Sequence, residues 1–181
     1  MTREFQKAQQ ALQAQRKTVV RDKNLADYAD QVYYINAKVA GASNTINLVG
    51  SNTKKEVGVT NLTGNFIAIG KQFPISAIRV MFSKNGNSEK EASYQDATGL
   101  PAELQNAELK LTQDNKVIFS LPMTVLQNFK NSDFKFLGTL GVLRDKIPFA
   151  LTIEMPENVV LPADRPAFLR VELMGIQRTN V

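Results

Sequence analysis

Three glutamates are the side chains in this sequence best suited to acid–base chemistry. Glu108, Glu154 and Glu172 each lie in or at the end of a predicted strand and could face one concave sheet, and carboxylate pairs of this kind hydrolyse glycosidic bonds. The alternation around Glu108 and Glu172 puts both on the polar face of their strands, where exposed carboxylates are ordinary. The chain also has no Trp to form a sugar platform. We therefore interpret the three glutamates as exposed strand side chains without a catalytic role, and predict that the chain is not an enzyme.

The residue types that are missing exclude most other catalytic chemistry. The 181-residue chain has no Cys and no His, which removes disulfides, thiolate nucleophiles, zinc–thiolate sites and histidine bases. Residues 64–72 (GNFIAIGKQ) approach a phosphate-binding loop, but five residues separate the glycines and Gln72 stands where Ser or Thr is required. We expect no catalytic residues, no cofactor, no metal ion and no small-molecule substrate.

Tyrosines are the remaining candidates for recognition. Tyr33, Tyr34 and Tyr94 could stack on nucleic-acid bases if basic residues surrounded them. Tyr33 and Tyr34 are adjacent on a predicted strand, so their side chains point to opposite faces. We expect at most one of these two to join a platform and the other to join the core.

The elements that would position these residues are β-strands. All ten glycines and all seven prolines lie beyond residue 40, and the apolar pattern after residue 30 has a period of two. The clearest signal is a hairpin at 108–121 with a turn at 113–115. The predicted strands are 32–39, 45–49, 57–61, 65–69, 75–83, 108–112, 116–121, 134–137, 149–154 and 167–176. Many short strands without alternating helices predict an all-β antiparallel sandwich or barrel.

The first thirty residues follow a different pattern. They contain no Gly or Pro and are rich in Gln and Ala, which favour helix. We predict a helix over about 3–16 that resumes around 24–29. Residues 1–23 hold six basic and two acidic residues, a formal charge of +4 out of +5 for the whole chain. The predicted organisation is a basic helical arm at 1–30 followed by a single β-sandwich domain at 31–181.

Two sets of side chains in the arm are candidates for contacts with partners. Phe5, Leu12 and Val19 are seven residues apart and form a narrow apolar stripe on one helix face. The basic set is Arg16, Lys17, Arg21 and Lys23. A basic arm on a near-neutral body is suited to contact with polyanions or anionic lipid. The polar start of the chain predicts no secretory signal.

Three segments resemble the jelly-roll capsid proteins of tailless, icosahedral bacterial viruses. They are residues 72–82 (QFPISAIRVMF), the hairpin at 109–122 and the closing strand at 167–175. The resemblance covers about residues 45–177 and lies in the order of the strands and in the general residue pattern of the segments. It implies an eight-stranded, jelly-roll-like β-sandwich with the α-helical N-terminal arm threading under neighbouring subunits, and it implies no catalytic residues. Because the chain has room for one barrel, a penton, spike-base or single-barrel shell protein is implied.

The resulting prediction is a viral structural protein, made in the host cytoplasm and located in the virion. It would bind copies of itself and other virion proteins, with the apolar stripe of the arm docked on a neighbouring subunit. The basic set of the arm would face the genome or an inner membrane. The alternative is a monomeric β-sandwich binding module that recognises carbohydrate or protein.

Overall fold

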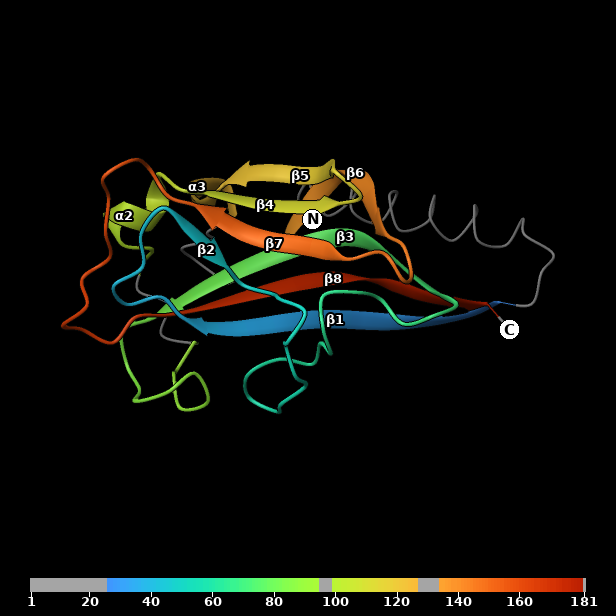
Figure 1. Ribbon diagram of the computed structural model, residues 1–181, viewed down its shortest axis with the longest axis horizontal. Helices are drawn as coiled ribbons and strands as arrows, with labels where there is room; N and C mark the ends of the chain where they lie inside the picture. The colour runs from blue at the N-terminus through green and yellow to red at the C-terminus, as the bar shows by residue number, and fades with distance from the viewer. Residues whose placement is uncertain (1–25, 95–98, 127–133, 181) are drawn as a thin grey trace, which may run out of the picture.

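The chain forms two antiparallel sheets that pack face to face (Figure 1). The computed structural model describes residues 26–94, 99–126 and 134–180. One sheet has the strand order β1-β8-β3-β6 and the other has the order β2-β7-β4-β5. The predicted all-β class and the two-layer sandwich are confirmed.

The strands differ in length between the two sheets. The first sheet contains β1 (Ala26–Lys38), β3 (Lys71–Ser83), β6 (Lys135–Leu143) and β8 (Phe168–Asn180). The second contains β2 (Thr45–Asn47), β4 (Glu108–Gln113), β5 (Lys116–Pro122) and β7 (Phe149–Glu154). Two one-turn helices flank the β4–β5 hairpin, α2 (Ala102–Gln105) before it and α3 (Met123–Leu126) after it.

Strand pairing follows one rule along the chain. β1 pairs with β8, β2 with β7, β3 with β6 and β4 with β5. These are the pairs of one long antiparallel hairpin, and its tip is the turn at Asp114 and Asn115. Both tip residues have left-handed φ angles, of 55° and 57°, which Asp and Asn tolerate better than most residues. Two further pairings, β3 with β8 and β4 with β7, complete the two sheets.

The hydrophobic core lies between the two sheets. Successive side chains of a strand point to opposite faces, so alternate residues enter the core. In β4, Leu109 and Leu111 are fully buried while Glu108 is exposed. In β8, Val171 and Leu173 belong to the core, which leaves Arg170 and Glu172 for the outer face of the first sheet.

A β-bulge in β3 changes which residues of that strand face the core. The register of β3 shifts between Ile75 and Ala77 against both of its neighbours. The core residues of β3 are odd-numbered before the bulge and even-numbered after it, and include Ile75 and Ile78. The hydroxyl of Ser76 donates to the backbone oxygen of Met174 at 3.0 Å. Without this extra residue, Arg79 would point into the core instead of outward.

Some expectations from the sequence are wrong. Residues 57–61 and 65–69 are not strands but parts of a long connection with turns and isolated bridges; positive φ angles at Gly58, Gly64 and Gly70 break up the extended backbone. The helix expected at 24–29 is wrong where the structure describes it, because Ala26–Ala29 belong to β1 and pair with 177–180 of β8. Long-range pairing overrides the helix preference there, and the expected boundary at residue 30 falls inside β1. The helix expected over 3–16 lies outside the described residues.

Gly175 of β8 is the point of closest approach to the β3 bulge. A Cβ at this position would overlap the carbonyl oxygen of Pro74 and would lie 2.9 and 3.0 Å from two ring atoms of the buried Phe73. We expect Gly175→Ala to lower the free energy of unfolding by about 1–3 kcal/mol, because neither neighbour can move without disturbing the bulge or the core. Urea denaturation measures the change.

Gly138→Ala is the matched control, because a Cβ at Gly138 of β6 meets nothing within 4 Å. Its expected effect is within about 0.5 kcal/mol of zero. Equal destabilisation by the two substitutions would show that contact with the bulge is not the cause.

Candidate functional site

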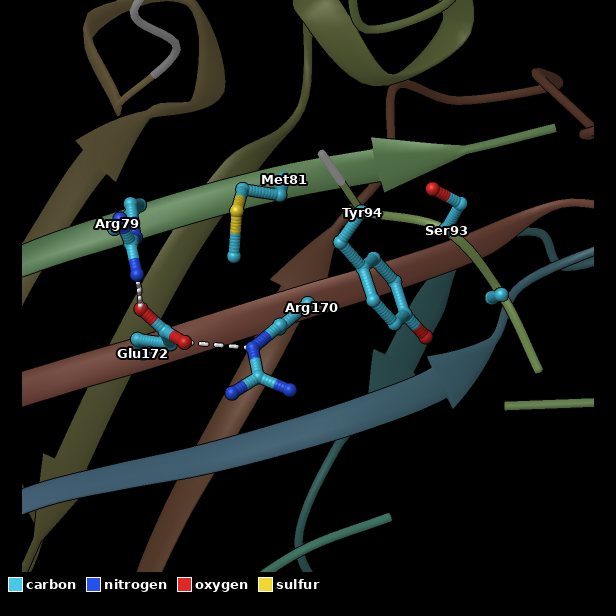
Figure 2. A pocket seen from close by; sticks show the side chains of 7 residues that line it. Arg79, Met81, Ser93, Tyr94, Arg170 and Glu172 are labelled. Atoms are coloured by element: carbon cyan, nitrogen blue, oxygen red, sulfur yellow. Dashed lines mark hydrogen bonds and ion pairs between the residues drawn. The ribbon is translucent and has the colours of Figure 1, made fainter. Parts of the chain in front are cut away.

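The outer face of the first sheet carries a cluster of charged and aromatic side chains beside a pocket (Figure 2). β8 presents Arg170 and Glu172 on this face, and β3 presents Arg79 and Met81 beyond its bulge. The loop after β3 brings residues 92–94 to the same place. The pocket has a volume of about 540 Å³ and is lined by Arg79, Met81, Ala92, Ser93, Tyr94, Arg170 and Glu172.

Glu172 lies at the centre of the cluster and is only 3% exposed. Its Oε2 accepts hydrogen bonds from Arg79, from Nε at 2.7 Å and from Nη2 at 2.5 Å. Its Oε1 accepts from Nε of Arg170 at 2.6 Å. Arg79 lies directly opposite Glu172 in the β3–β8 register, and Arg170 is two residues away on the same face of β8. One buried carboxylate therefore holds two guanidinium groups, and the group of three has a formal charge of +1.

Aromatic rings fix the planes of both guanidinium groups. The guanidinium carbon of Arg79 lies 4.4 Å from the ring centroid of Phe134. That of Arg170 lies 4.4 Å from the ring of Tyr34 and 5.9 Å from the ring of Tyr94. Cations within about 6 Å of a ring centroid are attracted to the ring face. The arginines are thus held by a carboxylate at one edge and by rings at their faces, while 24–29% of each side chain stays exposed.

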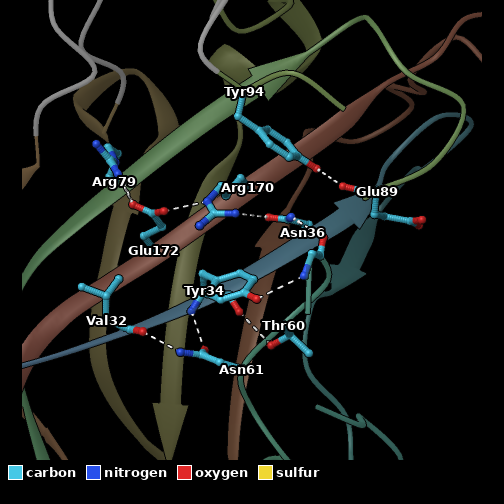
Figure 3. A network of polar contacts seen from close by, with 11 residues as sticks. Val32, Tyr34, Asn36, Thr60, Asn61, Arg79, Glu89, Tyr94, Arg170 and Glu172 are labelled. Atoms are coloured by element: carbon cyan, nitrogen blue, oxygen red, sulfur yellow. Dashed lines mark hydrogen bonds and ion pairs between the residues drawn. The ribbon is translucent and has the colours of Figure 1, made fainter. Parts of the chain in front are cut away.

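Asn36 and the loop at 56–61 support Arg170 from the side of β1 (Figure 3). Nη1 of Arg170 donates to Oδ1 of Asn36 at 3.2 Å, and Nδ2 of Asn36 donates to the carbonyl oxygen of Gly58 at 2.7 Å. The hydroxyl of Thr60 donates to the carbonyl oxygen of Tyr34 at 2.7 Å. Since Asn36 is 5% exposed, its amide is a buried link between the arginine and the loop.

Tyr94 closes the pocket from the loop after β3. Its hydroxyl donates to the carbonyl oxygen of Glu89 at 3.2 Å. Burial raises the pKa of Tyr94 to about 12, and the positive charge of Arg170 offsets only part of this increase. The phenol is therefore neutral at physiological pH and adds no negative charge to the pocket.

The structure separates the three glutamates considered as a possible carboxylate pair. Glu172 lies on the first sheet, whereas Glu108 and Glu154 lie opposite each other on β4 and β7 of the second. Both of the latter are exposed; Lys110 pairs with Glu154 at 2.9 Å, and the Ser120 hydroxyl donates to Glu108 at 2.9 Å. The prediction that these glutamates are exposed is confirmed for Glu108 and Glu154. It is wrong for Glu172, because the arginine partners and the adjoining loops cover its outward-facing side chain.

The tyrosines divide as the alternation predicts. Tyr33 packs against the core, with its ring 4.7 Å from that of Phe73 and at 77° to it, and Tyr34 lies on the outer face against Arg170. Sequence reasoning missed the meeting of Tyr34 and Tyr94 at this arginine. The one local signal was the Arg170-Val171-Glu172 alternation, which predicts that Arg170 and Glu172 share a face.

The arm residues predicted to contact partners, namely Phe5, Leu12, Val19, Arg16, Lys17, Arg21 and Lys23, lie outside the described residues. In the ranges that the structure describes, no three acidic side chains gather as potential metal ligands. No helix in those ranges is long and apolar enough to cross a membrane.

Comparisons of the chain with protein-family models, with curated proteins and with solved structures found no match.

Glu172 is expected to be the most important charged residue for stability among those of the cluster. Glu172→Gln leaves two half-buried guanidinium groups without their carboxylate and should lower the free energy of unfolding by about 2–4 kcal/mol. Glu154→Gln is the matched control, because Glu154 is an exposed strand glutamate with one lysine partner, and it should cost about 0–1 kcal/mol. Chemical denaturation of both variants measures the difference. Similar small losses would contradict a stabilising role for the buried cluster.

The raised pKa of Tyr94 gives a prediction in alkaline solution. Because its pKa in the folded chain, about 12, lies above the ordinary value of 10.0, the unfolded chain loses this proton first. The free energy of unfolding should be unaffected by Tyr94 below pH 10 and should fall as the pH rises towards 12. Ultraviolet absorbance of tyrosinate should show a step near pH 12 that Tyr94→Phe removes. An unchanged titration curve in that variant would show that Tyr94 is not protected by burial.

Proposed function

We propose that this chain is a jelly-roll subunit that self-assembles as part of an icosahedral virion. The observation that carries the proposal is the pairing of β1 with β8, β2 with β7, β3 with β6 and β4 with β5. This is the pairing of a single hairpin rolled into two four-stranded sheets, and eight strands in this arrangement make up the jelly roll of viral capsid proteins, lectins and cupins. Since a fold alone does not determine function, surface features must distinguish among these classes.

An apolar row on the outer face of the first sheet supports a subunit contact. Val32 pairs with Met174, Met174 with Ala77 and Ala77 with Phe136, so the row takes one residue from each strand. Val32 and Phe136, at its two ends, are 36% and 39% exposed. Ala77, in the middle of the row, is fully buried, so Val32 and Phe136 are the parts of the row that a neighbouring protein could cover. In the proposed assembly a neighbouring copy covers this row.

The N-terminal arm supplies a second contact in this proposal. β1 is an edge strand of the first sheet and begins at Ala26, so the residues before it join the sandwich at an edge, from which they can extend to a neighbour. The apolar stripe Phe5, Leu12 and Val19 docks on that neighbour. The basic set Arg16, Lys17, Arg21 and Lys23 faces the genome or an inner membrane, and other virion proteins complete the shell.

A monomeric binding module for carbohydrate or protein is the second candidate, and the pocket beside Arg170 and Tyr94 favours it. The two candidates differ in the mass of the particle in solution. A shell, vertex or spike subunit forms closed symmetric oligomers, whereas a binding module with a pocket built within one chain needs no second copy.

The mass of the full chain, measured by light scattering at low and high salt, tests the proposal. We expect a pentamer, a trimer or a shell-sized particle whose population rises with protein concentration. Contact of the basic arm with a polyanion should weaken as salt rises, because salt screens exposed charges. A monomer at all concentrations and salt levels would contradict self-assembly and favour the binding module.

A chain without residues 2–23 tests the role of the arm. The truncated chain is expected to keep the circular dichroism of a β-sandwich and to remain monomeric where the full chain assembles. Loss of folding in the truncated chain would contradict an assembly arm, since the arm would then be part of the folding unit.

A further inference from the structure

We propose that the outer-face pocket binds a carboxylate group, with the guanidinium of Arg170 as its main contact. The pocket is built within one chain, from β3, β8 and residues 92–94 of the loop after β3. The proposal therefore does not depend on self-assembly, and its test uses a different measurement from the particle mass.

The guanidinium of Arg170 has more hydrogen-bond donors than the described residues use. A guanidinium has five N–H donors. Nε donates to Glu172 and Nη1 donates to Asn36, and no acceptor among the described residues contacts Nη2. Figure 2 shows the two terminal nitrogens on the side of the guanidinium away from Glu172. Because the ring of Tyr34 lies 4.4 Å from the guanidinium carbon, a ligand would approach the edge of the group and not that face.

The charged groups of the pocket favour an anionic ligand. The lining holds two guanidinium groups and one carboxylate, and Tyr94 is neutral because its pKa is about 12. The guanidinium of Arg170, whose side chain is 24% exposed, is partly withdrawn from water, where ionic interactions are stronger than in bulk solvent. A carboxylate matches the single charge of this group, whereas a phosphate at neutral pH carries up to two negative charges.

The rest of the pocket wall is largely apolar. Met81, Ala92 and the ring of Tyr94 contribute apolar surface beside the polar groups. A volume of about 540 Å³ lies within the usual range for small-ligand sites. A carboxylate on a short carbon stem suits this combination: the stem contacts the apolar wall, and the two oxygens accept from the arginine edge in the paired geometry that guanidinium groups favour.

Ligand-observed saturation-transfer NMR tests the proposal on the full chain, in whatever oligomer it forms. The probes are butyrate, which has one carboxylate on a short carbon stem, its neutral isostere butyramide, and inorganic phosphate. Butyrate should bind saturably, butyramide should show no binding, and phosphate should compete weakly. Absence of saturable binding, equal binding of the neutral isostere, or stronger binding of phosphate would overturn the proposal.

Variants distinguish recognition from a structural role of Arg170. Arg170→Lys keeps the positive charge but loses the two parallel N–H donors of the guanidinium, and should weaken butyrate binding by about tenfold or more. Arg144→Lys is the matched control, because Arg144 is an exposed arginine with one carboxylate partner, Asp114, at 3.1 Å; it should bind as the unchanged chain does. If Arg170→Lys fails to fold, Ala92→Leu adds bulk at the pocket wall without changing Arg79, Arg170 or Glu172 (the ion cluster), and should weaken binding comparably. Unaltered binding in the folded pocket variants would overturn the proposal.

A glutamate-containing tripeptide with blocked ends identifies the source of the carboxylate. Tighter binding of the tripeptide than of butyrate supports an acidic side chain of a partner protein. Tighter binding of butyrate supports a free small acid. Failure of both probes contradicts a carboxylate site, and it would leave the measured particle mass, and hence the proposed assembly, unaffected.

Discussion

The buried carboxylate of Glu172 imposes a constraint on the whole first sheet. A charge that is 3% exposed is costly unless opposite charges and hydrogen bonds surround it. β8 supplies one partner two residues away, but the other must come from β3, and Arg79 faces outward only because the bulge at Ser76 shifts the alternation of that strand. A slip of one residue between β3 and β8 would move Arg79 to the core and leave Glu172 with one partner. The ion cluster and the bulge therefore specify the same register.

The same cluster joins segments that the core alone would leave independent. Arg170 contacts β1 through Asn36 and Tyr34, and Asn36 in turn bonds the loop at 56–61. Tyr94 brings the loop after β3 over the other side. Since loops with few buried contacts open most readily, these polar and aromatic contacts are what hold the pocket walls in place. Side chains on the inner face of the sheet pack in the core, whereas the contacts on the outer face hold the loops in position.

How far the sequence predicts this structure depends on the range of the interactions. The β4–β5 hairpin follows from local alternation and the Asp114–Asn115 turn, and the opposite faces of Tyr33 and Tyr34 follow from strand geometry. The strand at Ala26–Ala29 could not be predicted locally, because its pairing partner, residues 177–180 at the end of β8, lies about 150 residues later in the chain. The burial of Glu172 was missed for the same reason: its exposure depends on Arg79, a bulge and two loops, none of which leaves a signal near residue 172.

The apolar row and the ion cluster lie next to each other on the outer face of the first sheet. Val32 and Met174 form one register pair, and Tyr34 and Glu172 form the next outward-facing pair, two residues along each strand. Two residues of a strand span about 6.6 Å, so a protein that covers the apolar row also brings its own side chains within reach of the pocket. An acidic side chain at that rim would add a directional, charge-assisted contact to a surface that otherwise offers only apolar burial. Apolar contacts tolerate rotation and sliding, whereas a carboxylate held by a guanidinium fork does not. In the proposed assembly, the cluster would thus fix the orientation of a partner that the apolar row alone would leave free to rotate or slide.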